Sequence, residues 1–193
     1  MTLSDLFDQK DLKPKQITCH SGGAEGADTE WEIACEKIGI KVNAYSYKTK
    51  YHTTKNKIEI SDADYSDGIE EIKKANRIMK RGGINKYMNL LARNWSQVKY
   101  SDQIFAIGQI IEGPIIDGGT GWAIMMAIQN NKEVFVFDQI RDHWFIWSDV
   151  NNKFIEYSIP KISTYNFAGI GTRKLKPNGL KAINDVINLV NNI

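Results

Sequence analysis

A β-branched stretch runs into a cluster of glycines at Ile17–Asp28, whose sequence is ITCHSGGAEGAD. A helix-like pattern starts just after Gly26, so the segment predicts a strand that passes through a glycine turn into the N-terminus of a helix. Such a turn favours anions, because backbone N–H groups point at the ligand, the helix dipole attracts negative charge, and glycine lets a phosphate approach the main chain. The residues from which we expect ligand contacts here are Ser21, Gly22, Gly23, Glu25, Gly26 and Asp28.

We expect different roles for three polar side chains of this turn. Ser21 can donate its hydroxyl hydrogen to a phosphate oxygen. Asp28 falls in the first helical turn, where a carboxylate is favoured, so it either caps the helix or accepts a hydrogen bond from a ribose hydroxyl. Glu25 projects from the turn either as a solvated loop residue or as a ligand contact.

Two later glycine loops repeat this chemistry, DGGTG at Asp117–Gly121 and AGIGTR at Ala168–Arg173. Glycine amides and the Thr120 hydroxyl are phosphate donors, and Arg173 can hold an oxyanion through two parallel hydrogen bonds. Three such loops in one chain predict a shared phosphate pocket. The contacts expected from the two later loops are Gly118, Gly119, Thr120, Gly121, Gly171, Thr172 and Arg173.

Strands alternate with helices along the chain, which predicts an α/β fold with a mainly parallel sheet covered on both faces. In such sheets ligands bind beyond the carboxyl ends of the strands, where the three loops should gather. The expected strands are Gln16–Ser21, Ile40–Tyr45, Gln103–Ile107, Glu133–Phe137 and Thr164–Ala168. The expected helices are Ala27–Lys37, Asp67–Arg81, Asn85–Val98, Gly119–Asn130 and Pro177–Val190.

Three segments fall outside this alternation. Residues 1–15 form an N-terminal arm. Tyr47–Ser66 is polar, irregular and too long for a mere connector, so we expect a functional loop or lid, with Asp62 and Asp64 solvated. His143–Ser158 alternates around two asparagines and predicts an inserted β-hairpin.

Composition places the chain among ordinary globular proteins. Its 193 residues are 42% hydrophobic and 25% charged, which fits a single domain over residues 1–193. A net charge of +2 and scattered lysines disfavour a nucleic-acid partner, and no apolar run reaches the roughly 20 residues of a membrane span. Cys19 and Cys35 fall on core positions, so we expect reduced thiols and a cytoplasmic location. The histidines lack metal-ligand spacing and no catalytic triad is visible, so we predict neither a metal site nor catalytic residues.

The motif SGGAEGAD resembles the glycine loop of the SLOG superfamily, a Rossmann-like group that includes DNA-processing proteins, Lonely Guy phosphoribohydrolases and molybdenum cofactor carriers. Ala92-Arg93-Asn94 together with Gln97, the DGGTG loop and FAGIGTR at Phe167–Arg173 are similar to further parts of that pattern. The turn that ends in GTR comes last here, as in the molybdenum cofactor carrier branch, and the pair of motifs also resembles phage-encoded SLOG proteins.

The resemblance implies a Rossmann-like three-layer sandwich that binds a nucleotide-like ligand with its phosphate on the glycine loops. It adds Arg93 and Asn94 of the middle helix to the expected contacts, although Arg93 could equally be a surface salt-bridge partner. No further cofactor is implied, and relatives of this kind are often homo-oligomers. The phosphoribohydrolase branch carries a glutamate shortly after its glycine loop, whereas Trp122 and apolar residues follow here.

We therefore expect a binding protein rather than an enzyme. It would sense or sequester a nucleotide-derived, phosphate-bearing molecule, in one version as a phage protein that evades anti-phage defence by sequestering a cyclic or ADP-ribose-like immune signal. The alternatives are a phosphoribohydrolase-like nucleotide hydrolase and a molybdenum cofactor carrier. The hairpin, with Trp144 and Trp147, would cover the pocket, stack on a base, contact a second subunit or form a satellite core.

Overall fold

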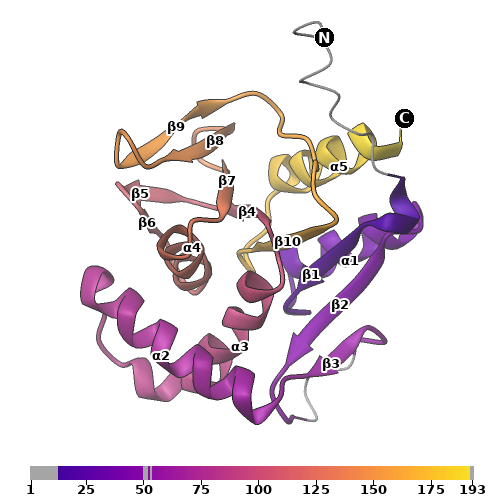
Figure 1. Cartoon of the computed structure of the whole chain (residues 1–193). Coiled ribbons are helices and arrows are strands. Elements are labelled where there is room, and N and C mark those ends of the chain that lie inside the picture. The colour runs from indigo at the N-terminus through magenta and orange to yellow at the C-terminus, as the bar shows by residue number, and fades with distance from the viewer. Residues whose placement is uncertain (1–12, 50–51, 53, 192–193) are drawn as a thin grey trace, which may run out of the picture.

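The computed structural model describes residues 13–49, 52 and 54–191. An eight-stranded sheet with the order β3-β2-β1-β10-β4-β7-β8-β9 lies between two layers of helices (Figure 1), which confirms the expected Rossmann-like α/β sandwich. The strands are β1 (Thr18–Ser21), β2 (Lys41–Ser46), β3 (Lys57–Glu59), β4 (Gln103–Gly108), β5 (Ile110–Glu112), β6 (Ile115–Ile116), β7 (Glu133–Asp138), β8 (His143–Ser148), β9 (Lys153–Tyr157) and β10 (Asn166–Gly171). The helices are η2 (Pro14–Gln16), α1 (Ala27–Lys37), α2 (Asp62–Met79), η3 (Ile84–Tyr87), α3 (Met88–Lys99), α4 (Thr120–Gln129) and α5 (Pro177–Asn191).

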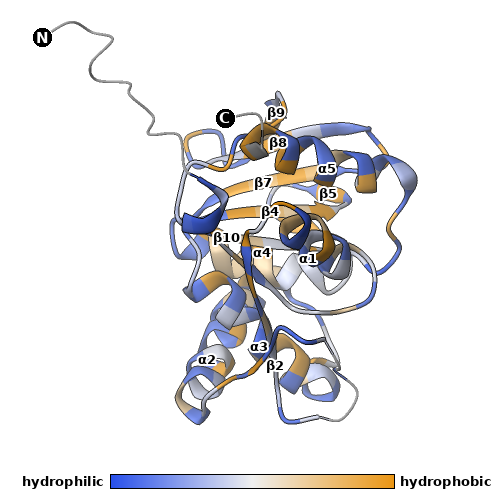
Figure 2. Cartoon of the chain, turned by 90° about the vertical axis from the view of Figure 1, so that its right-hand side faces the viewer, coloured by the Kyte–Doolittle hydropathy of each residue, from blue (hydrophilic) through white to orange (hydrophobic). Residues whose placement is uncertain are grey.

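The sheet separates two hydrophobic cores, one on each face. Helices α2, α3 and α4 pack on the face that carries Ile104, Ala106 and Val136, while α1 and α5 pack on the face that carries Phe105 and Phe137. Successive residues of β4 and β7 thus alternate between the two cores, and both strands are apolar along most of their length (Figure 2). This continuous apolar character is typical of strands that are covered on both faces.

The last strand, β10, lies in the middle of the sheet between β1 and β4, and it is parallel to both. From β1 the chain crosses through α1 to β2, and from β4 it crosses through α4 to β7 on the other side of β10. Because such crossovers are right-handed, the two helices cover opposite faces, and the direction of winding reverses around β10. Ligands bind α/β sheets at such a reversal point, beyond the carboxyl ends of the strands.

The segment Tyr47–Ser66 is more ordered than the sequence suggested. It contains β3, the edge strand that pairs with β2, and it includes the first turns of α2, which starts at Asp62 rather than at Asp67. The Ser61 hydroxyl caps this helix by accepting a hydrogen bond from the Asp64 amide at 3.1 Å. Asp64 was expected in solvent but is buried, and its carboxylate pairs with Lys99 at 2.7 Å.

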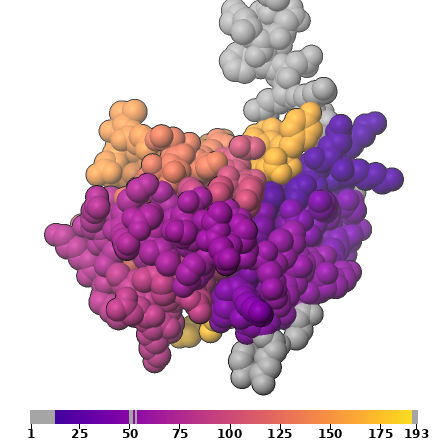
Figure 3. All heavy atoms as spheres, turned by 60° about the horizontal axis from the view of Figure 1, so that its bottom comes forward, coloured from indigo at the N-terminus to yellow at the C-terminus, as the bar shows by residue number. Residues whose placement is uncertain are grey.

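The hairpin predicted at His143–Ser158 is confirmed as β8 and β9, which extend the sheet in antiparallel fashion from β7. Trp144 is only 3% exposed and packs edge-on against Phe105 and Phe137, while the Trp147 ring packs against Phe154. The two tryptophans therefore belong to the cores. Orange atoms of this hairpin lie at the margin of the face that Figure 3 turns to the viewer, beyond the central magenta segments.

Two smaller points complete the comparison with the expected elements. Most of the predicted arm lies outside the described residues, and its end forms the 3-10 turn η2. A small antiparallel sheet, β5 and β6, precedes the DGGTG loop and was not predicted. Within the described ranges, no helix combines the length and the apolar character that a membrane crossing requires.

Candidate functional site

A cavity of about 600 Å³ lies at the carboxyl ends of the central strands and at the N-terminus of α4. All three glycine loops and helix α3 contribute to its wall. Of the residues expected to contact a ligand, the cavity is lined by Asp28, Arg93, Asn94, Gly118, Gly119, Thr120, Gly171, Thr172 and Arg173. Ser21, Gly22, Gly23, Glu25, Gly26 and Gly121 are not among the lining residues.

Asp28 joins the first loop, the third loop and α3. Its Oδ1 accepts a hydrogen bond from the Gly171 amide at 2.9 Å, and its Oδ2 lies 3.7 Å from Nη1 of Arg93. It also accepts a backbone hydrogen bond from Ala24. Burial raises the pKa of this carboxyl to about 6, against the opposing effects of Arg93 and the two amides. Asp28 thus holds the loops together, because the partners of its carboxyl come from the first loop, the third loop and α3.

Arg93 is not a surface residue. Only 5% of it is exposed, and its ion-pair partner is the equally buried Asp28. Burial lowers the pKa of the guanidinium, although the Asp28 charge opposes this effect. Nη1 of Arg93 has no hydrogen-bond partner among the described residues, which is costly for a buried donor. The alternative of a solvent-exposed salt bridge is therefore wrong.

The glycines of the first loop make room for other protein groups. A Cβ on Gly22 would lie 1.4 Å from Nη1 of Arg93 and 2.5 Å from Oδ2 of Asp28. Gly26 has φ +99°, and a Cβ there would lie 2.6 Å from the Thr172 carbonyl oxygen. Gly26 needs glycine because its φ is positive and the backbone of the third loop packs directly against it, whereas Gly22 leaves room for the ends of the Arg93 and Asp28 side chains.

Several backbone amides of the first and third loops already have partners inside the protein. The Gly23 amide donates to the Ser21 hydroxyl at 3.2 Å, the Ala27 amide to the Thr172 carbonyl at 3.0 Å, and the Gly171 amide to Asp28. The buried Ser21 hydroxyl lies within hydrogen-bond distance of the Asp28 carbonyl and of Oε1 of Glu32. These groups therefore fix the loops, and they do not face an incoming anion.

The second loop differs in that its residues Gly118, Gly119 and Thr120 line the cavity and their amides are open. Among the described residues, the amides from Gly118 to Gly121 have no acceptor. Arg81 holds this loop by donating from Nη1 to the Gly118 carbonyl and from Nη2 to the Ile116 carbonyl, both at 2.6 Å. The N-terminus of the ten-residue helix α4 thus faces the cavity with free N–H groups, which favours a negative charge.

Charge in the cavity is predominantly positive. Arg81, Arg93, Arg173 and Lys174 line it, against the two carboxylates of Asp28 and Asp117. Arg173 and Lys174 are exposed, and no described carboxylate pairs with either of them. These two cations are therefore available to an anionic ligand at the third loop.

Several lining residues were missed from the sequence. Arg81 was read as the end of a helix, and its position before Gly82-Gly83 was the available signal. The apolar part of the wall gave no local signal, because its residues read as core positions of their helices. These residues are Ile84, Tyr87, Leu90, Leu91, Trp122 and Ala123, and none of the lining residues comes from the β8–β9 hairpin.

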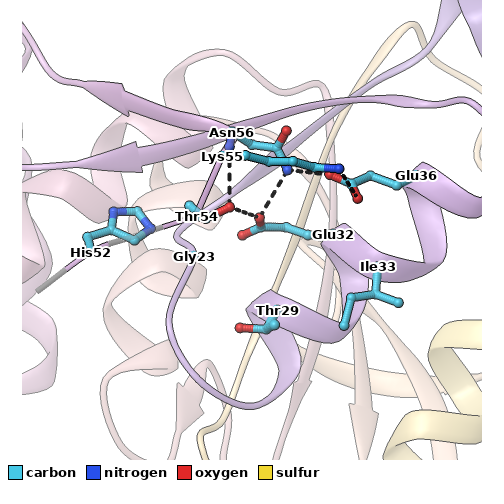
Figure 4. Close-up of a pocket in the computed structure, with 9 residues that line it drawn as sticks. All are labelled: Gly23, Thr29, Glu32, Ile33, Glu36, His52, Thr54, Lys55 and Asn56. Carbon is cyan, nitrogen blue, oxygen red and sulfur yellow. Dashed lines mark hydrogen bonds and ion pairs between the residues drawn. The ribbon is translucent and has the colours of Figure 1, made fainter.

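A second cavity of about 330 Å³ lies on the other side of the first loop, between α1 and residues 52 and 54–56 (Figure 4). Oε2 of Glu32 accepts hydrogen bonds from Thr54 at 2.8 Å and from Asn56 at 3.3 Å, and Glu36 accepts one from Asn56 at 2.6 Å. Glu32, Glu36, Thr54 and Asn56 satisfy one another, so this network fastens the segment to α1, whereas Nε2 of His52 is buried without a hydrogen-bond partner among the described residues. His52 lies against Gly23, and burial together with the Arg93 charge lowers its pKa.

Comparison with known proteins does not assign the site. No protein-family model, no curated protein and no solved structure matches the chain. In the described part of the chain, no group of three or more His, Cys, Asp or Glu side chains is placed to hold a metal ion.

Proposed function

We propose that this protein binds a nucleotide-derived, phosphate-bearing small molecule in the 600 Å³ cavity and does not convert it. The observation that carries the proposal is the convergence of three distant glycine loops and two arginines, Arg93 and Arg173, on one cavity. The volume falls within the roughly 300–1,000 Å³ of small-molecule sites. Sensing or sequestration of a signalling nucleotide, as the resemblance to SLOG proteins implies, is compatible with such a site.

The anionic part of the ligand would lie between the open amides of the second loop and the unpaired cations of the third. Helix α4 contributes the positive end of its dipole, and Arg173 contributes a guanidinium that can bind two oxygens at once. Because Ser21 and the glycines of the first loop do not line the cavity, and Asp28 is engaged by Gly171, the first loop supports the site without supplying the phosphate contacts.

The first test is chemical. Ligand that co-purifies with the protein is released by heat and identified by mass spectrometry, which separates nucleotides from a pterin. Calorimetric titration with AMP, ADP-ribose and a cyclic dinucleotide then measures affinity. A protein that carries no phosphate ester and binds none of the three would contradict the proposal.

Substitution of Arg173 locates the anion. We expect Arg173→Ala to weaken binding by roughly 1.5–3 kcal/mol, the range of charge-assisted hydrogen bonds. Arg77→Ala removes another exposed arginine, from α2, that does not line the cavity, and it should leave affinity unchanged. Equal effects of the two substitutions would indicate a non-specific contribution of charge.

One observation favours a second candidate function, hydrolysis of the nucleotide. Asp28 lines the cavity and has a pKa of about 6, in the range suited to a general acid near neutral pH. Prolonged incubation with AMP distinguishes the two functions, since release of free adenine that is lost in Asp28→Asn would establish hydrolysis. Return of unaltered AMP supports binding alone.

A further inference from the structure

The lining of the cavity is chemically divided. Cations and open amides come from the second and third loops, whereas an apolar part comes from η3, the start of α3 and the first turn of α4. The side chains of this apolar part are Ile84, Tyr87, Leu90, Leu91, Trp122 and Ala123. A phosphate alone occupies the space of only a few water molecules of about 30 Å³ each, so it would leave most of the 600 Å³ and all of this wall without contact.

Tyr87 is the exposed aromatic residue of this wall. It is 52% exposed, and no hydrogen bond or ring–ring contact of its side chain is found in the described part of the chain. Within the described residues, the Tyr87 ring makes one cation–π contact, with the ammonium group of Lys86 at 5.5 Å from the ring centroid. In contrast, Tyr45 and Tyr100 stack on each other and hydrogen-bond through their hydroxyls. Tyr87 therefore presents an unused aromatic face at the cavity.

Amide side chains of α3 border the same space. Asn94 and Gln97 line the cavity and are 8% and 2% exposed. Nε2 of Gln97 is buried and has no hydrogen-bond partner among the described residues. A buried amide donor without a partner is rare and points to an acceptor that is supplied from elsewhere.

We infer that the apolar wall holds a heteroaromatic base, with Tyr87 stacked on its face and the Gln97 amide hydrogen-bonded to its edge. The inference rests on the proposed function and identifies the part of the ligand that gives specificity. An aliphatic acid would fill the wall, but it would leave the Gln97 amide without an acceptor, whereas a purine or pyrimidine ring supplies both the flat surface and ring acceptors. Tyr87 and Gln97 thus become the specificity residues of the site.

The experiment compares the affinities of inorganic phosphate, ribose 5-phosphate, AMP and GMP for the wild-type chain by calorimetry. We expect at least one of the two nucleotides to bind 10-fold or more tightly than ribose 5-phosphate, in line with the usual strength of base–aromatic stacking. In Tyr87→Ala and in Gln97→Leu this preference should fall to within about 3-fold, while affinity for ribose 5-phosphate stays the same. Tyr87→Phe keeps the ring and should retain the preference.

Tyr165→Ala is the matched control, because Tyr165 is 47% exposed and lies just before β10, at the end of that strand opposite to the cavity. It should bind all four probes as the wild type does. Equal affinity for nucleotides and ribose 5-phosphate, or a preference that survives in Tyr87→Ala, would overturn the inference while leaving phosphate binding intact. Failure of the wild type to bind any of the phosphate esters would overturn the proposed function as well.

Discussion

The buried carboxyl of Asp28 gives the folded protein a stability term with an unusual pH dependence. Its folded-state pKa is about 6, raised by burial from an ordinary value of 3.8. The folded protein therefore binds this proton more tightly than the unfolded chain does. The contribution to stability is fully present below pH 3.8 and is lost as the pH rises through 6.

The size of this term follows from the two pKa values. The rise of the Asp28 pKa from 3.8 to about 6 corresponds to about 3 kcal/mol over the whole pH range. Between pH 4.5 and 7.5 the linkage relation gives a loss of about 2 kcal/mol. Asp28→Asn cannot ionise, so it lacks this term while keeping an oxygen that can accept the Gly171 hydrogen bond.

The measurement is the free energy of unfolding in urea of the wild type and of Asp28→Asn across this pH range. We expect the value for the wild type minus that for the variant to fall by about 2 kcal/mol as the pH rises from 4.5 to 7.5. Asp64→Asn is the control, and its difference should stay flat from pH 4.5 to 7.5. Burial alone would raise the pKa of Asp64, but hydrogen bonds from Lys99, Ser61 and Tyr100 lower it overall, so its contribution is lost only below pH 3.8. A flat or rising difference for Asp28→Asn would refute the reasoning.

Three further substitutions test packing and helix capping, which do not depend on pH. Gly22→Ala places a methyl group 1.4 Å from Nη1 of Arg93 and should destabilise the fold by roughly 1–3 kcal/mol in urea unfolding. Gly82→Ala is the control, because no atom lies within 4 Å of its added Cβ, and it should change stability by less than about 0.5 kcal/mol. Ser61→Ala removes the cap of α2 and should cost about 1 kcal/mol, with a loss of helical signal in circular dichroism; an unchanged stability would show that the cap does not form. Trp144→Ala should lower the free energy of unfolding by roughly 3–5 kcal/mol without altering ligand affinity. Reduced affinity in a variant that is still folded would show instead that the hairpin belongs to the ligand site.

Local patterns in the sequence were sufficient for most of the sheet. Strands covered on both faces read as short apolar runs, so Gln103–Ile107 and Glu133–Phe137 were predicted within one residue of β4 and β7. The start of α2 was missed because the acidic residues after Ser61 were read as a solvated loop. The serine followed three residues later by Asp64 was the available capping signal.

The position of β10 could not be predicted from local pattern. Nothing in Thr164–Ala168 indicates that the last strand inserts between β1 and β4, because strand order is set by pairing between distant segments. This insertion brings the third glycine loop next to the first. The sequence predicted that the glycine loops would gather at one edge of the sheet. The pairing of β10 explains which of these loops contact each other.

The chemical roles of the three glycine loops also depend on contacts between distant segments of the chain. Glycine-rich turns are expected to approach a ligand, yet the turn after β1 packs against Thr172 and Arg93, and its Gly23 and Ala27 amides donate within the protein. A glycine in the sequence indicates that the backbone can approach a neighbouring group closely. It does not indicate whether that group belongs to a ligand or to another part of the chain. The contact that answers this question, from Asp28 to Gly171, spans 143 positions.

Asp28 also determines how the cavity is prepared for a ligand. Its carboxylate occupies, between the first and third loops, the place that an anion would otherwise take, so the loops are held together before any ligand binds. A ligand phosphate then meets open amides at α4 and the exposed cations Arg173 and Lys174 without first ordering the chain, which lowers the entropic cost of binding. Because these cations are exposed whereas the Asp28–Arg93 pair is buried, added salt should weaken binding well before it weakens the assembly of the site.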